Sequence, residues 1–110
     1  SGDIKYDIAK IRHSVVGGFD TITNGLYSAT YDEKNGIKFD IYKPKNYQVI
    51  CEKLDSQIKQ NWNLDEIKMI EGLLFISMLP LHKDNLENQL AFYSIGIQRL
   101  NEIFGNVSQR

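Results

Sequence analysis

Residues 63–80 read NLDEIKMIEGLLFISMLP, and this stretch decides the fold. Asn63 is followed three residues later by Glu66, which is the pattern of a capping box at a helix N-terminus. The remainder is apolar on nearly every side up to a proline, as is typical of a helix buried in the middle of a domain. We therefore expect a central helix over residues 64–79. Because glycine disfavours helices, Gly72 indicates the close approach of a neighbouring element.

Amphipathic helices are expected on both sides of this central segment. Residues 46–60 and 85–104 each repeat apolar side chains at intervals of three or four positions. A second capping box begins at Asp84, and Gly105 is expected to end the last helix.

A short first helix is expected over residues 4–15, with Asp3 as its N-cap. It carries one apolar stripe, formed by Ile4, Ile8, Ile11 and Val15. The pair Gly17-Gly18 should end this helix, since glycine enters the left-handed conformation at little cost. Lys5, Lys10 and Arg12 are interpreted as a solvated basic side.

A β-hairpin is expected over about residues 26–42. Tyrosine and isoleucine alternate with polar residues on both sides of Asn35-Gly36, a dipeptide that favours a tight reversal. Two strands alone are marginal in water, so the hairpin must pack on helices or join a sheet outside this chain. The resulting class is α+β and mainly α: a short helix, a hairpin, then three helices packed around a buried third helix.

Composition is ordinary for one globular domain covering residues 1–110. The chain has a formal net charge of −1, 42% hydrophobic residues and 25% charged residues, which argues against disorder. Cys51 is the single cysteine, so a disulfide scaffold is excluded. The isoelectric point near 6.1 argues against nucleic-acid binding, and no apolar run is long enough for a membrane span. The composition fits a reduced bacterial cytoplasm.

Few residues indicate chemistry. His13 and His82 are the two histidines, and neither stands in a metal-ligand pattern, so no metal site is expected. His82 lies in the turn before the last helix. Its side chain either binds a ligand or takes an acid/base role there, or it hydrogen-bonds to a carbonyl at a helix end. His13 follows Arg12, but no catalytic pattern surrounds the pair, and no catalytic residue is assigned. Tyr27 offers a stacking surface, although hairpin tyrosines usually form cross-strand pairs.

The opening segment, residues 2–9, reads GDIKYDIA. It resembles the Gly-Asp-x-x-Tyr-Asp-Leu-Ala segment of the aminoglycoside phosphotransferase and choline kinase-like family, over about fifteen residues in all. The resemblance implies the C-terminal lobe of a protein-kinase-like fold. Asp7 matches the aspartate that buttresses the catalytic loop in that family. The catalytic loop, the magnesium ligands and the nucleotide-binding lobe would lie upstream, so ATP and magnesium are implied for the full-length protein only.

Three hypotheses follow. The first is the substrate-side, C-terminal portion of a phosphotransferase acting on a sugar, choline or another hydroxyl compound, inactive alone and partnered by its upstream catalytic half or by a second copy. Its substrate-side candidates are His82, His13 and Tyr27. The second is a self-contained binding protein, such as a bacterial immunity protein or an adaptor. The third is an enzyme that uses His82 and nearby carboxylates. A severed lobe should expose a large apolar patch, whereas a self-contained protein should cover its third helix on all sides.

Overall fold

The computed structural model describes residues 4–108 and has the predicted class, α+β and mainly α. The elements in chain order, with η1 a 3₁₀ helix, are α1 (Ile4–Val15), α2 (Phe19–Thr23), β1 (Tyr27–Asp32), β2 (Gly36–Ile41), α3 (Tyr47–Lys59), α4 (Leu64–Ser77), η1 (Leu79–His82) and α5 (Leu86–Ser108). The short helices α2 and η1 were not predicted. Among the described residues, no helix combines the length and the apolar character that crossing a bilayer requires.

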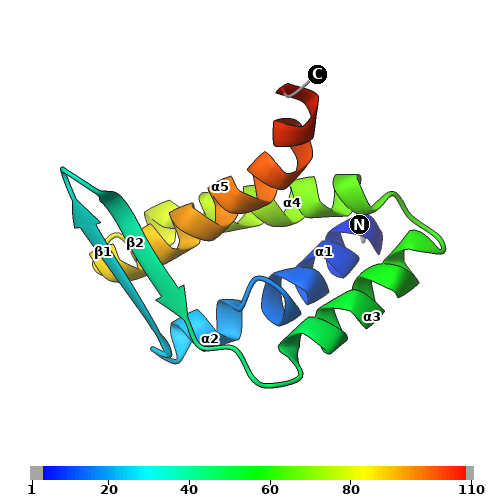
Figure 1. Cartoon of the computed structure of the whole chain (residues 1–110), viewed down its shortest axis with the longest axis horizontal. Helices are drawn as coiled ribbons and strands as arrows, with labels where there is room; N and C mark the ends of the chain where they lie inside the picture. The colour runs from blue at the N-terminus through cyan, green and yellow to red at the C-terminus, as the bar shows by residue number, and fades with distance from the viewer. Residues whose placement is uncertain (1–3, 109–110) are drawn as a thin grey trace.

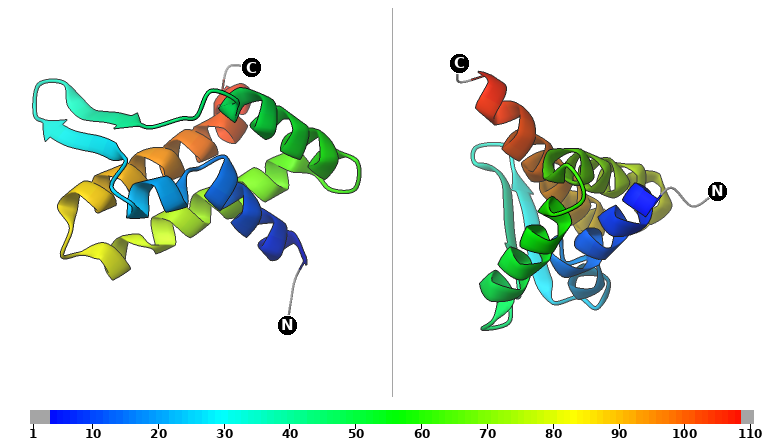
Figure 2. Two further views of the ribbon diagram at one scale, coloured as in Figure 1. Left: turned by 90° about the horizontal axis from the view of Figure 1, so that it is seen from below. Right: turned by 90° about the vertical axis from the view of Figure 1, so that its right-hand side faces the viewer.

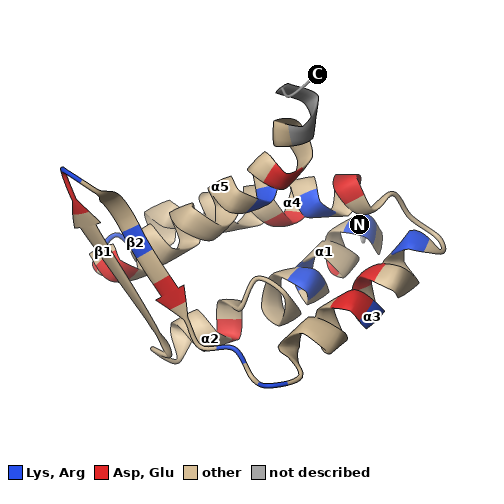
Figure 3. Ribbon diagram, viewed as in Figure 1, with Lys and Arg blue, Asp and Glu red and all other residues tan. Residues whose placement is uncertain are grey.

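Helices α4 and α5 lie side by side and form the centre of the molecule (Figure 1). Two glycines let their backbones approach closely: a methyl group at Gly72 would lie 3.2 Å from the carbonyl oxygen of Gly96. This confirms the interpretation of Gly72. Helix α1 packs against α4, and α3 contacts both α1 and α4. Charged residues of both signs are interspersed over the helices and the hairpin (Figure 3).

Two apolar clusters fill the interior. The larger lies between α2, β1, α4 and α5 and contains Ile22, Ala29, Phe75, Ala91, Phe92 and Ile95. The smaller joins α1, α3 and α4 through Ala9, Ile58 and Ile67. Helix α4 is therefore central, as predicted, but it is not buried on every side. Leu73 is 53% exposed, and the charged Glu71 is fully buried.

The hairpin forms as predicted and lies across the first half of α5 (Figure 2). Its strands are antiparallel, with Tyr27 opposite Ile41 and Asp32 opposite Gly36. Gly36 has a φ of +78°, and the Asp32 carboxylate accepts a hydrogen bond from the backbone N–H of Lys34. The backbone N–H of Ala29 donates to Glu87 on α5. The helices thus supply the packing that two strands alone lack.

Helix ends follow the predicted capping residues in part. The Asn63 side chain accepts the backbone N–H of Glu66 at 3.1 Å, as the capping box predicts. For α5 the cap is Asn85, which accepts the N–H of Asn88, so the assignment to Asp84 was one residue early. Gly105 does not end α5, which continues to Ser108. Asp3, the expected cap of α1, lies outside the described residues.

The first helix ends as predicted, and Gly18 is left-handed with a φ of +76°. The apolar stripe of α1, however, faces largely outward: Ile4 is 57% exposed and Ile11 is 52% exposed. The buried residues of α1 are instead Ala9, Arg12 and His13. The interpretation of Arg12 as part of a solvated basic side was therefore wrong, because its guanidinium lies inside the protein, bonded to carboxylates.

Gly17 provides a test of the packing. A methyl group there would lie 2.5 Å from the Phe75 ring and 2.9 Å from a Glu71 carboxylate oxygen. Gly17→Ala should lower the free energy of unfolding by about 1–3 kcal/mol, measured by urea denaturation. The control is Gly105→Ala, where a methyl group meets nothing within 4 Å and better helix propensity should raise stability by up to about 1 kcal/mol. Equal effects of the two substitutions would contradict the packing described.

Candidate functional site

The most unusual feature of the interior is a carboxylate between two arginines. Glu71 on α4 has no exposed surface. One of its oxygens accepts a hydrogen bond from Arg12 on α1. The other accepts from Nε of Arg99 on α5 at 2.9 Å. Both arginines are themselves buried, with 3% and 6% of their surfaces exposed, so these charges depend on one another for compensation.

Further charged groups extend the contact between Glu71 and its two arginines into a row. Arg12 forms a two-point contact with Asp55 on α3, at 2.8 and 3.0 Å. Arg99 donates from Nη1 to Glu102 at 2.6 Å, and Glu102 also pairs with Lys68 at 3.1 Å. We call this row the ion chain, and its members in order are Asp55, Arg12, Glu71, Arg99, Glu102 and Lys68. It alternates in sign, has no net charge and ties α1, α3, α4 and α5 together.

Arg12 shows the electrostatic consequence of this arrangement. Burial disfavours its charge, but the hydrogen bonds and charges of Asp55 and Glu71 outweigh that effect and raise the pKa of the guanidinium. Arg12 therefore stays charged in the interior of the protein.

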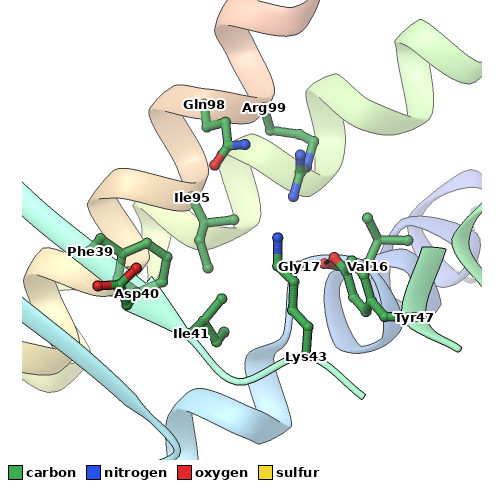
Figure 4. Close-up of a pocket in the computed structure, with 10 residues that line it drawn as sticks. All are labelled: Val16, Gly17, Phe39, Asp40, Ile41, Lys43, Tyr47, Ile95, Gln98 and Arg99. Carbon is green, nitrogen blue, oxygen red and sulfur yellow. Dashed lines mark hydrogen bonds between the residues drawn. The ribbon is translucent and has the colours of Figure 1, made fainter. Parts of the chain in front are cut away.

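A cavity of about 390 Å³ lies beside Arg99 (Figure 4). It is enclosed by the turn after α1, by β2 and the segment that follows it, and by α5. Its lining residues are Val16, Gly17, Phe39, Asp40, Ile41, Lys43, Tyr47, Ile95, Gln98 and Arg99. The volume is within the range of small-molecule sites, about 300–1,000 Å³. We call it the Lys43–Arg99 cavity.

Tyr47, at the start of α3, forms one wall of this cavity. Its hydroxyl donates to the carbonyl of Val16, and the ammonium of Lys43 lies 5.1 Å from its ring centre. Burial and the nearby Cys51 raise the pKa of Tyr47 to about 12. The neutral hydroxyl thus fixes the ring, and the ring in turn supports the lysine.

The three predicted substrate-side residues do not form one groove. His13 is 7% exposed; its ring centre lies 4.1 Å from that of Phe75 and 4.7 Å from that of Phe19, and its Nε2 lies 3.3 Å from the sulfur of Met78. Burial lowers the pKa of His13 to about 4, although Asp20 opposes the shift. This is the environment of a neutral core residue.

The other two predicted substrate-side residues, His82 and Tyr27, each lie beside a different aromatic ring. His82 ends η1, with its ring centre 4.8 Å from that of Phe92. The Tyr27 hydroxyl hydrogen-bonds to Asn88 on α5, and burial together with Glu87 raises the pKa of that hydroxyl. Tyr27 also pairs with Phe39 across the hairpin. Asp7 lies exposed on α1.

Sequence reasoning missed the ion chain and the Lys43–Arg99 cavity. One signal was available: Glu71 is a lone carboxylate within an apolar helix, where a charge requires a partner. Nothing in the spacing of the two arginines identified them as those partners, since 59 and 28 residues separate them from Glu71.

Within residues 4–108, no three His, Cys, Asp or Glu side chains come together as a possible metal site. Comparisons with protein-family models, curated proteins and solved structures gave no match.

From the ion chain we predict that removing its central carboxylate lowers the free energy of unfolding strongly. Glu71→Gln should lower the free energy of unfolding by about 3–5 kcal/mol, because both buried arginines lose a charged partner. The control is Glu66→Gln on the same helix, where the contact to Lys5 is exposed and the loss should stay below about 1 kcal/mol. Urea denaturation measures the free energy of unfolding of both variants. If Glu71→Gln lowers it as little as the control does, the two buried arginines do not depend on Glu71 for their charge compensation.

His13 predicts a loss of stability in mild acid. The unfolded chain has the ordinary pKa of 6.5 and the folded chain one of about 4, so between these values the unfolded state binds more protons. The free energy of unfolding should therefore fall by about 2 kcal/mol between pH 7.5 and pH 5 from this residue alone. Denaturation at both pH values should show that His13→Gln has lost this decrease, whereas His82→Gln retains it. The same decrease in all three proteins would rule out His13 as its source.

Proposed function

We propose that this chain is the substrate-side helical portion of a small-molecule phosphotransferase and that it does not transfer phosphate alone. The substrate would be a sugar, choline or another hydroxyl compound. The nucleotide, the magnesium ions and the catalytic loop would be held by the upstream part of the same protein. The proposal begins from the resemblance of residues 2–9 and is supported by the surface and the cavity described above.

The observation that carries the proposal is the outward orientation of apolar residues on α1. Ile4, Ile11 and Val15 are exposed along one side of that helix. Val15 also lines a small groove together with Ile50 of α3, which is 40% exposed. We call these four residues the outer apolar face. Exposed apolar side chains along one side of a helix offer a contact surface for another protein segment, and such a surface is what a lobe separated from its partner should expose.

Asp7 lies on the exposed surface of the same helix. The resemblance assigns to it the acceptance of backbone hydrogen bonds from the catalytic loop. Its carboxylate is accessible to such a segment, and its role would be one of positioning. Phosphoryl transfer depends on the positioning of reactants and on metal-held charge, so disturbing the loop should slow the reaction without removing any reacting group.

The Lys43–Arg99 cavity is the proposed substrate site. It is lined by apolar side chains and by polar or charged groups from four different parts of the fold, and its volume lies in the range of small-molecule pockets. We also place the protein in the bacterial cytoplasm, where the free thiol of Cys51 would remain reduced.

The test uses the product of the complete natural gene. We expect it to be longer than this chain, to bind magnesium-ATP by calorimetry and to phosphorylate a hydroxyl compound. Asp7→Asn should lower its kcat/KM about tenfold to a hundredfold through misplacement of the catalytic loop.

The matched control is Asp65→Asn, at an exposed position in the first turn of α4, which should leave kcat/KM unchanged. Equal activity of the two variants would contradict the role of Asp7. A natural product of about this length that binds no nucleotide would overturn the phosphotransferase proposal. That result would favour the second hypothesis, a self-contained binding protein.

A further inference from the structure

We propose that the Lys43–Arg99 cavity binds a small polyhydroxyl compound that carries a phosphate or carboxylate group. This inference names the substrate class of the proposed phosphotransferase and rests on that proposal for the reaction alone. The binding itself is a property of the described residues and can be measured on this chain.

Two cationic side chains point into the cavity from different elements (Figure 4). Arg99 is almost fully buried, and its Nε and Nη1 are held by Glu71 and Glu102. Among the described residues, no hydrogen bond engages its Nη2, which leaves this nitrogen as a donor for a ligand. Arg99 is thus oriented before any ligand arrives, so little conformational entropy is lost on binding.

Lys43 supplies the charge that the ion chain does not. Within residues 4–108 it forms no salt bridge, and its ammonium stays near the face of the Tyr47 ring. The ion chain is neutral overall, so Lys43 is the excess positive charge at this end of the cavity. An anionic oxygen between Lys43 and Arg99 would receive charge-assisted hydrogen bonds from both, which are about twice as strong as neutral ones.

The opposite end of the cavity favours hydroxyl groups. Asp40 on β2 lies there, away from Arg99 (Figure 4). Asp40 is exposed, so its carboxylate lies at the rim of the cavity, where it accepts hydrogen bonds and repels an anion. Beside Arg99, the amide of Gln98 on α5 both donates and accepts (Figure 4). These groups would orient a ligand with its anionic group toward Arg99 and its hydroxyl groups toward Asp40.

The walls between these ends are fixed by packing. A methyl group at Gly17 would collide with the Phe75 ring, so the backbone at this wall is tightly held. Ile95 is 3% exposed and belongs to the larger apolar cluster. The Tyr47 hydroxyl is bonded to the backbone of Val16. The cavity is therefore preorganised by contacts that do not involve the ligand.

The test is a titration of the isotope-labelled chain followed by amide NMR shifts. The probes are glucose 6-phosphate, glucuronate, inorganic phosphate and glucose. We expect saturable shifts around Gly17, Lys43 and Arg99 with at least one of the two anionic sugars, whose comparison separates phosphate from carboxylate. Inorganic phosphate should bind more weakly, because it lacks the hydroxyl groups that reach Asp40. Glucose should cause no saturable shift.

Lys43→Met removes the excess charge at an exposed position where folding should not suffer, and it should weaken binding of the anionic sugar about tenfold. Lys45→Met is the control: this lysine is exposed on the same segment but does not line the cavity, and its loss should leave affinity unchanged. The proposal is overturned if neither anionic sugar binds saturably, if glucose binds as tightly as they do, or if the two variants behave alike.

The outcome is separable from that of the proposed function. Anionic sugar binding by this chain, together with no phosphoryl transfer by the natural gene product, would sustain the site and reject the phosphotransferase. Phosphoryl transfer by the gene product, with no anion binding in the cavity, would support the phosphotransferase and reject the anion site.

Discussion

Glu71 lies fully buried in the middle of α4 and is bound by two arginines that come from the helices on either side. Each arginine is held on its other side by a further carboxylate, Asp55 for Arg12 and Glu102 for Arg99. Removing Glu71 leaves two buried arginines without a charged partner, so the positions of α1, α4 and α5 depend on one another, and Asp55 extends this dependence to α3. The same contacts fix the guanidinium of Arg99 at the edge of the cavity, and structure and candidate function therefore share one constraint.

Much of the fold could be predicted because its signals are local. The cap at Asn63, the reversal at Gly36 and the helix end at Gly18 each depend on a few neighbouring residues. Gly72 indicated a close contact, and Gly96 across the helix pair provides it. Where local signals compete, prediction was wrong: α5 continues through Gly105, whose backbone keeps a right-handed conformation.

The candidate site could not be predicted in the same way. The spacing of the apolar residues shows that one side of α1 is apolar. It does not show which side is buried, and the buried side carries Arg12 and His13. The burial of Arg12 depends on Glu71 and Asp55, which are distant from it in sequence and come close only after folding. Lys43 lies in a segment without regular structure, so no pattern connected it with Arg99. Tertiary charge pairing thus overrides hydrophobic periodicity at the place where the cavity forms.

The most direct test of this account is a double-mutant cycle between Arg12 and Arg99. The two arginines bind opposite oxygens of one carboxylate, so they are coupled through Glu71. The free energies of unfolding of Arg12→Met, Arg99→Met and the double variant, measured by urea denaturation, give the coupling. The account predicts a coupling free energy of at least about 1 kcal/mol. Additive effects, within about 0.3–0.5 kcal/mol, would show independent sites and contradict the ion chain as a single unit.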